Sequence, residues 1–291
     1  MQGFLNVNKP AGITSHDCVA QLRKVLKIRQ IGHGGTLDPA AVGVLPIAVG
    51  KATRLLQFLP PEKAYRAVIR FGLRTTTDDL EGEVMECRPT PTLSLEQVQT
   101  ILPAFLGTIQ QLPPRYSAIQ VGGQRLYTLA RSGIDIEVPP RLVEIYRLDV
   151  LDWRAGDFPE LEVAIHCSSG TYIRSIARDM GDLLQTGGTL AALTRTHSGG
   201  FCLADSIALE AITDTTPLIG PELALAHLPA ITLSAQEAQR WGHGQRLARP
   251  PQPGMLPGAC RVLDENDRFL GIGDWQSIEL GWRLQPKVVY G

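Results

Sequence analysis

The sequence predicts an α+β protein with one large domain followed by a small β domain. Residues 65–72 and 161–166 alternate apolar and polar side chains, which is typical of strands with one buried face. Residues 19–26 and 173–184 instead repeat apolar side chains every three or four positions, as helices do. Beyond residue 228, short apolar runs are separated by Pro and Gly, which indicates a compact set of short strands.

Within the first part of the chain, capping residues and paired Gly or Pro residues indicate where the elements begin and end. Thr14 or Ser15 is suited to cap the helix at 19–26, because a side-chain oxygen there can accept from a free backbone amide. Farther on, paired Gly and paired Pro residues break the chain into short pieces. We therefore expect a surface insertion at about 110–147.

The second half of the chain places a strand, a tight turn and a helix in direct succession. The strand at 161–166 is followed by Ser-Ser-Gly at 168–170 and then by the helix at 173–184. Such a turn at a helix N-terminus is a common place for polar site residues. Near residue 230 the sequence changes to short apolar runs separated by Pro and Gly. This change predicts two domains, residues 1–230 and residues 232–291.

Composition excludes several classes of protein. The chain has 291 residues with a formal net charge of −1, and no apolar run approaches the roughly 18 residues of a membrane helix. Its five cysteines are widely spaced, which argues against a disulfide framework and against a zinc site built on Cys-x-x-Cys. We expect a cytoplasmic protein without contact to a membrane.

The charge is distributed unevenly along the chain. Residues 1–76 contain 11 Lys or Arg against three acidic residues, whereas acidic residues are in excess elsewhere. Such a segment can form a face that binds a polyanion, although a solvated basic surface is an equally good interpretation of the charge alone.

Two familiar motifs fail on inspection. The segment 43–53 resembles a phosphate-binding loop, but six residues separate its glycines and Ala52 follows Lys51 where Ser or Thr is needed. The six histidines form no His-x-x-x-His pair. We therefore expect neither a metal nor a nucleotide cofactor.

Asp38 is the first candidate for chemistry. It lies just before the last residue of the segment 32–39, Gly-His-Gly-Gly-Thr-Leu-Asp-Pro, whose glycines permit close approach of a ligand to the backbone. A residue before proline favours extended geometry, which would present the carboxylate in a loop. The alternative is that Asp38 caps a helix that begins at Pro39.

Arg174 is the second candidate. It follows Tyr172 in the first turn of the helix at 173–184, where a positive charge opposes the helix dipole. This placement suggests a carboxylate or phosphate partner elsewhere, and the alternative is an ordinary surface arginine.

Together these segments resemble the bacterial TruB family of tRNA pseudouridine synthases. The matching motifs cover most of residues 3–201 in the family's order. They are Asn8-Lys9-Pro10-x-Gly12-x-Thr14-Ser15, Gly32-His33-x-Gly35-x-Leu37-Asp38-Pro39, Gly43-Val44-Leu45-Pro46, Lys63-x-Tyr65 leading through Gly72 and Arg74 to Asp79, Pro113-Pro114-x-Tyr116-Ser117-Ala118, Gly123-x-Arg125-Leu126-Tyr127, residues 169–175 (Ser-Gly-Thr-Tyr-Ile-Arg-Ser) and Leu193-x-Arg195-x-x-x-Gly199-x-Phe201. The chain departs from the family at Gln120 and His197, where basic residues are common.

The resemblance implies a fold and an activity. The family fold is a mixed, mainly antiparallel sheet flanked by helices, with a small C-terminal RNA-binding β domain of PUA type. The implied activity is the isomerisation of uridine 55 in the T loop of tRNA. This reaction breaks the N1 to C1′ bond and joins C5 to C1′, and it needs a carboxylate nucleophile but no cofactor.

The resemblance also assigns roles to residues of the reaction centre. Asp38 would be the nucleophile, by attack on either C6 of the base or C1′ of the sugar, and Arg174 would hold it ionised through a two-pronged pair. Tyr65 would stack on the target base and assist removal of the C5 proton. Tyr172 would line the pocket and Leu193 would close it.

Two more residues are assigned to substrate binding by resemblance. His33 would occupy the space of the extruded uridine or stack on its neighbours, and Lys9 would contact the substrate. The expected partner is the T stem-loop of tRNA, with no obligatory protein partner and a monomeric protein. The alternatives are a non-catalytic tRNA-folding chaperone and a synthase for a different RNA.

Overall fold

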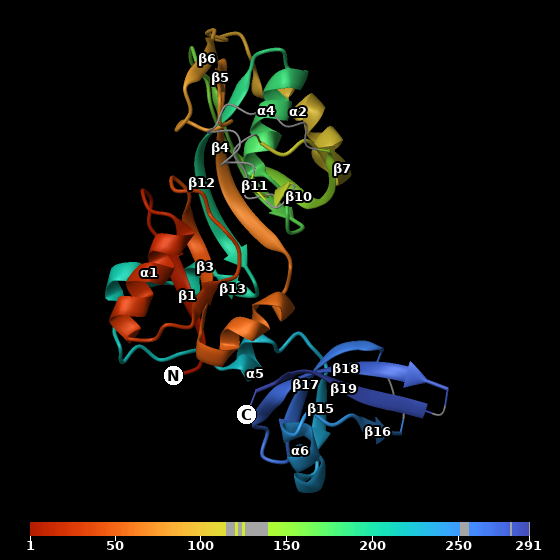
Figure 1. The fold of residues 1–291 in the computed structure, drawn as a ribbon. Coiled ribbons are helices and arrows are strands. Elements are labelled where there is room, and N and C mark those ends of the chain that lie inside the picture. Colours follow the sequence, from red (N-terminus) through yellow and green to blue (C-terminus); the bar gives the residue numbers. More distant parts are fainter. Residues whose placement is uncertain (115–119, 122–123, 126–138, 251–255, 280, 291) are drawn as a thin grey trace.

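The computed structural model describes residues 1–114, 120–121, 124–125, 139–250, 256–279 and 281–290 (Figure 1). A ten-stranded sheet forms the main body, with strands in the order β14-β1-β3-β12-β4-β11-β10-β7, β2 beside β3 and β13 beside β12. Its strands are β1 Gly3–Lys9, β2 Ile31–His33, β3 Val42–Val49, β4 Lys63–Phe71, β7 Gly107–Gln111, β10 Arg141–Arg154, β11 Glu160–Cys167, β12 Gly188–Ser198, β13 Phe201–Cys202 and β14 Ile207–Ala208.

Most neighbouring strands of this sheet are antiparallel. Parallel pairing occurs between β1 and β14 and between β3 and β12. The long strands β4 and β12 pair along nearly their whole length and connect the two halves of the sheet in Figure 1. The predicted mixed, mainly antiparallel sheet is therefore confirmed.

The structure contains the two helices that the periodicity predicted, α1 and α4, and further helices that were not predicted. The helices are α1 Ser15–Leu26, α2 Leu95–Ile101, α4 Ile173–Leu183, α5 Pro221–Ala224 and α6 Ala235–Gly242, with short 3-10 segments η1 Gly50–Phe58, η2 Leu102–Phe105, η3 Leu203–Asp205 and η4 Leu209–Ala211. Thr14 caps α1, and its hydroxyl accepts from the amide of Asp17 at 3.0 Å while the Asp17 carboxylate accepts from the amide of Thr14 at 2.9 Å. None of the helices in the described ranges is long and apolar enough to cross a membrane.

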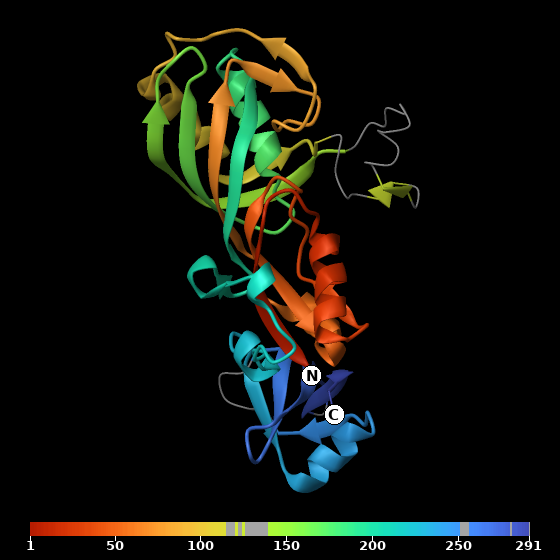
Figure 2. The same cartoon turned by 90° about the vertical axis from the view of Figure 1, so that its left-hand side faces the viewer.

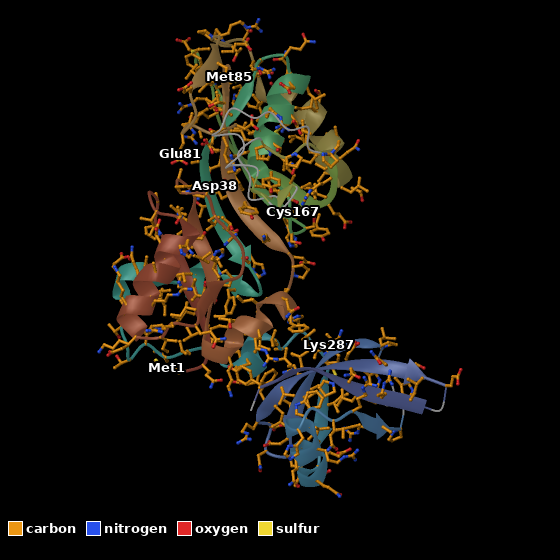
Figure 3. The ribbon with its side chains drawn as sticks, viewed as in Figure 1. Met1, Asp38, Glu81, Met85, Cys167 and Lys287 are labelled. Carbon is orange, nitrogen blue, oxygen red and sulfur yellow. The ribbon has the colours of Figure 1, made fainter. Side chains whose placement is uncertain are left out.

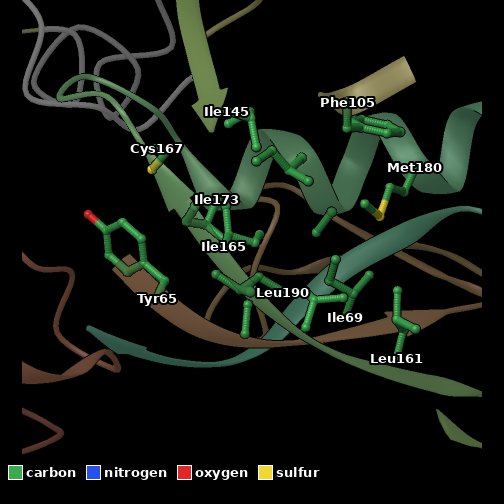
Figure 4. Packing of buried hydrophobic residues seen from close by; sticks show 14 of the residues in the cluster. Tyr65, Ile69, Phe105, Ile145, Leu161, Ile165, Cys167, Ile173, Met180 and Leu190 are labelled. Carbon is green, nitrogen blue, oxygen red and sulfur yellow. The ribbon is translucent and has the colours of Figure 1, made fainter. Parts of the chain in front are cut away.

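The core under α4 comes from strands that alternate as the sequence predicted. Tyr65, Ile69 and Phe71 of β4 face the same side as Ile165 of β11, and with Met180 of α4 they belong to one buried cluster (Figure 4). The other side of β4 carries Arg66 and Arg70 beside Ala64 and Val68. This alternation gives the sheet one face for a site and one open face.

The segment expected as an insertion lies between two paired strands. Its flanks are not loops, because β7 and β10 pair from Arg141 opposite Gln111 to Ile145 opposite Gly107. Between them the structure describes the short strands β8 Gln120–Val121 and β9 Gln124–Arg125. The Tyr116 motif, Gly123, and Leu126 and Tyr127 of the next motif lie outside the described residues.

The C-terminal part is the predicted small β domain. Five strands form a second sheet in the order β15-β17-β18-β19-β16, namely β15 Ala230–Leu233, β16 Leu247–Arg249, β17 Gly258–Asp264, β18 Phe269–Ile278 and β19 Gly281–Val289. Figure 2, turned by 90°, shows it below the main sheet and next to η1.

One apolar cluster crosses the boundary between the two sheets. Phe4 and Leu55 from the main body share it with Phe269, Ile272 and Val288 from the C-terminal sheet. The two sheets are therefore joined by a common core as well as by the chain. Assignment of PUA type to the second sheet stays a prediction.

Candidate active site

Asp38 lies in the loop of residues 34–41 that joins β2 to β3, and the start of α1 fixes this loop. The Ser15 hydroxyl accepts from the amide of Leu37 at 2.8 Å and lies 3.2 Å from the Leu37 carbonyl. The chain continues from Pro39 directly into β3, so the alternative in which Asp38 caps a helix is wrong. The Asp38 side chain stays 38% exposed, at the junction of the two halves of the sheet (Figure 3).

Arg174 holds this carboxylate with two donors. It lies in the first turn of α4, and its side chain is 6% exposed. Nε lies 3.0 Å from Oδ2 of Asp38, and Nη2 donates to Oδ1 at 3.3 Å. Side-on pairing of this kind fixes the plane of a carboxylate as well as its charge. The alternative of an ordinary surface arginine is wrong.

A second carboxylate approaches the same arginine. Asp79 lies in the turn between β5 (Leu73–Thr75) and β6 (Val84–Cys87), and its Oδ2 is 3.6 Å from Nη1 of Arg174. The same nitrogen donates to the carbonyl of Thr77 at 2.9 Å. An ion pair of 3.0 Å between Arg178 and Asp78 ties the turn to α4. One guanidinium is thus shared between two carboxylates from distant segments.

These neighbours act on the pKa of Asp38 in opposite directions. Burial raises the pKa and the charge of Asp79 raises it further, whereas Arg174 lowers it through its charge and hydrogen bonds. The net effect places the pKa of Asp38 above the ordinary value for aspartate. The carboxylate is therefore poorly stabilised by solvent, and Arg174 is the neighbour that keeps its anionic form accessible.

Arg195 fixes the other side of the Asp38 loop. Its side chain is fully buried on β12, and Nε donates to the carbonyl of Val44 at 2.7 Å. Nη2 donates to the carbonyl of Gly35 at 3.1 Å and Nη1 to that of Thr36 at 3.3 Å. Arg195 also lies opposite Tyr65 of β4 in the sheet, and the two side chains interact electrostatically. The guanidinium therefore connects β3, β4 and the loop that carries Asp38.

Tyr65 and Leu193 lie on the sheet face that carries the site. Tyr65 is 7% exposed and lies opposite Arg195, while Leu193 lies opposite Ala67 and packs against the cluster under α4. In Figure 4 the hydroxyl of Tyr65 points away from the packed apolar side chains. Burial raises the pKa of Tyr65. The phenol is therefore neutral near pH 7 and presents an aromatic ring beside the site.

Tyr172 is held through its backbone. The side-chain amide of Gln111, at the end of β7, accepts from the amide of Tyr172 at 2.8 Å and donates to its carbonyl at 3.0 Å. Tyr172 makes no side-chain cap, and this pairing instead fixes the backbone of the residue that precedes α4. Gln111 was not among the predicted site residues, because its spacing from Tyr172 carries no local signal.

His33 and Lys9 differ in their hydrogen bonding. His33 ends β2, and among the described residues its buried Nδ1 has no hydrogen-bond partner. Burial and the charge of Arg195 lower its pKa, so the ring is neutral near pH 7. Lys9 is fully buried and donates to the carbonyls of Pro10, Ile13 and Pro39 at 2.7 to 3.0 Å. All three of its donors are used by the protein, so Lys9 supports the Asp38 loop from behind.

The structure therefore brings Asp38, Arg174 and Tyr65 to one place and adds two charged residues, Asp79 and Arg195. Both belong to sequence motifs quoted above, and the presence of charge in those motifs is the signal that could have found them. Among the described residues, no three His, Cys, Asp or Glu side chains are arranged to hold a metal ion. The polar groups at the site are suited to hold one carboxylate in a fixed orientation.

The chain is similar to known pseudouridine synthases over nearly its whole length. Residues 23–173 match the N-terminal domain of the TruB family pseudouridylate synthases, and residues 229–289 match the C-terminal domain of pseudouridine synthase II TruB. A tRNA pseudouridine synthase B of Trichormus variabilis is 57% identical over 286 residues, 95% of this chain and 96% of the relative. One of Gloeobacter violaceus is 57% identical over 297 residues, 99% of each chain.

Solved structures extend the likeness to the fold. A chain from an H/ACA ribonucleoprotein bound to a substrate RNA with 2′-deoxyuridine superposes with a TM-score of 0.75 at 24% identity, over 99% of this chain and 85% of the other. A chain of a Cbf5-Nop10-Gar1 complex gives a TM-score of 0.73 at 27% identity, over 99% and 84%. The fold is the pseudouridine synthase fold, and by sequence the chain belongs to the TruB family of pseudouridylate synthases.

Proposed function

We propose that this protein converts uridine 55 in the T loop of tRNA to pseudouridine, with Asp38 as the nucleophile. The observation that carries this proposal is a half-exposed carboxylate held by two donors of the buried Arg174. The relatives are tRNA pseudouridine synthases B, which supports tRNA as the substrate. The basic segment at residues 1–76, with its 11 Lys or Arg, offers a polyanion a complementary charge.

In this mechanism the uridine is extruded from the loop and its base enters beside Asp38. Asp38 attacks C6 of the base or C1′ of the sugar, and the N1 to C1′ bond breaks. The uracil turns, C5 bonds to C1′, and the bond between Asp38 and the substrate breaks, which returns its electron pair to the carboxylate. The proton on C5 leaves and N1 gains a proton. The product is an isomer of the substrate, so no oxidant, reductant or external group is required.

The other residues position the base. Tyr65 supplies a ring for stacking, and its raised pKa argues against a phenolate that removes the C5 proton. Tyr172 lines the pocket, Leu193 closes it against water, and His33 fills the space that the extruded uridine leaves. Lys9 acts indirectly, because its ammonium holds Pro39 next to the nucleophile.

The test replaces Asp38 by Asn, which keeps the shape and removes the negative charge. Release of tritium from a T stem-loop RNA labelled at C5 of the target uridine reports turnover, and filter binding reports affinity. We expect release to stop while the dissociation constant changes by less than about threefold. The exposed Asp205 provides a matched control, Asp205→Asn, for which both readouts should equal those of the parent protein.

The same assay distinguishes the alternatives. Binding of the T stem-loop by the parent protein without tritium release would favour a tRNA-folding chaperone. Release from another RNA, but not from the T stem-loop, would favour a different substrate. Undiminished release by Asp38→Asn would remove Asp38 as the nucleophile.

A further inference from the structure

Lys63 is a basic residue on the site face that the mechanism above does not use. It is the first residue of β4 and lies two positions before Tyr65, which puts both side chains on the same face about 7 Å apart along the strand. Its neighbours across the sheet are Cys167 on β11 and Ser198 on β12, both buried. Lys63 therefore lies at the edge of the site, next to Tyr65 on the same face of β4, the residue whose ring is proposed to stack on the base.

The charge of Lys63 is not matched by the protein. Within the part of the chain that the structure describes, Lys63 makes no ion pair or hydrogen bond, although its side chain is half-buried. Its neighbour Glu62 pairs instead with His166 at 3.1 Å. By contrast, Lys9 and Arg195 donate hydrogen bonds to backbone carbonyls. The donors of Lys63 are therefore available to a ligand.

A second positive charge stands close to Lys63. A Cβ placed on Gly35 would lie 3.3 Å from Nζ of Lys63 and 3.7 Å from Nη1 of Arg195, so both cations approach the same point of the Asp38 loop. Gly35 has a φ of 132°, which L side chains rarely adopt, and the absence of a side chain lets both cations approach its backbone. Burial and the charge of Arg195 both lower the pKa of Lys63. An anion at this corner would relieve the repulsion between the two cations.

We propose that Lys63 binds a phosphate of the RNA strand beside the target uridine and so positions the strand for extrusion of the base. An RNA strand carries one negative charge per nucleotide, and an ammonium is a compact point charge that suits a phosphate. The distance of about 7 Å from Lys63 to Tyr65 along β4 places this contact within about one nucleotide of the base. The inference rests on the proposed function, because it requires RNA in the site.

The first experiment compares Lys63→Met with Arg147→Met in the full-length protein. Arg147 lies opposite His166 on the other face of the sheet with its side chain 73% exposed, so it provides a matched loss of one positive charge. We expect Lys63→Met to weaken binding of a T stem-loop RNA about tenfold at low salt. The slope of log affinity against log salt should fall by about 0.7 to 0.9, the value of one phosphate contact. Lys63→Arg should restore most of the slope, and Arg147→Met should leave it unchanged.

The second experiment locates the phosphate. T stem-loop RNAs are made with one neutral methylphosphonate at each linkage near the target uridine, and each is bound by the parent protein and by Lys63→Met. At one linkage the methylphosphonate should weaken binding by the parent protein about tenfold and leave binding by Lys63→Met unchanged. Independent effects at every linkage, or a slope unchanged in Lys63→Met, would overturn the phosphate contact.

The scan also separates this inference from the proposed function. Tritium release and salt-dependent binding by the parent protein establish the function first, and the scan is interpreted on that baseline. If Lys63→Met is unstable by thermal melting, Lys63→Gln replaces it in the same scan. A parent protein that binds RNA normally, with a scan that shows no coupling to Lys63, would reject the phosphate contact alone.

Discussion

The two walls of the site each contribute a buried arginine, and the two arginines bind different groups. On the α4 wall, Arg174 pairs with the carboxylate of Asp38 and lies near that of Asp79. On the β12 wall, Arg195 donates to backbone carbonyls, including those of Gly35 and Val44. The comparison indicates that Arg174 controls the charge state of Asp38 and that Arg195 controls the shape of the loop carrying it.

The largest effect is expected for Arg195→Met, which removes a cation that no solvent reaches. The carbonyls of Gly35, Thr36 and Val44 would lose a charged donor inside the protein. We expect the free energy of unfolding to fall by about 3 kcal/mol or more, as for other buried polar networks that lose one member. Urea unfolding followed by circular dichroism measures this, and a loss below about 1 kcal/mol would contradict the structural role of Arg195.

The next effect concerns Arg174→Lys and should appear in chemistry. Lysine keeps the charge but cannot reproduce the two-pronged pair with Asp38. We expect the single-turnover rate at saturating enzyme to fall about tenfold, equivalent to about 1.4 kcal/mol. Since Arg174 lowers the pKa of Asp38, its weaker replacement raises that pKa, and the acidic limb of the pH profile should move to higher pH.

Arg178 provides the control for this prediction. It lies one turn farther along α4 and pairs with Asp78 and Asp179. Arg178→Lys should keep the acidic limb where it is in the parent protein. An unchanged rate and pH profile for Arg174→Lys would show that the pairing with Asp38 is not needed for the reaction.

The sequence predicted the parts of this arrangement that depend on local patterns. The spacing of Val19, Leu22 and Leu26 indicated α1, and the alternation around Ile69 and Ile165 indicated the strands under α4; the structure confirms both. Local patterns work because the period of an element is set by its own backbone geometry. The family motifs then pointed to Asp38 and Arg174.

The contacts between distant segments could not be predicted in this way. Asp79 reaches Arg174 only because the turn between β5 and β6 is tied to α4, and Phe4 and Val288 belong to one cluster only because the two sheets share a core. Strand order and register decide such contacts, and no periodicity encodes them. Lys9 shows the same limit, because its contact with Pro39 follows from the packing of two segments that are 30 residues apart.

The smallest effect is expected on the open face of β4, where Arg70 lies opposite Glu160. Nε and Nη2 of Arg70 donate to one oxygen of Glu160 at 2.9 and 2.7 Å, but its side chain is 37% exposed. Glu160 also pairs with Arg154 at 3.1 Å, so Arg70→Met leaves it a partner.

We therefore expect Arg70→Met to lower the free energy of unfolding by less than about 1 kcal/mol, because water screens the pair and the neighbouring arginine replaces it. The difference from the parent protein should shrink further in about 1 M salt, where charges more than about 3 Å apart are screened. Urea unfolding at low and high salt measures both effects. A loss of 2 kcal/mol or more that persists in high salt would show that the exposed Arg70 stabilises the fold as much as a buried arginine does. Burial would then not explain why Arg195 is expected to contribute more to stability than Arg70.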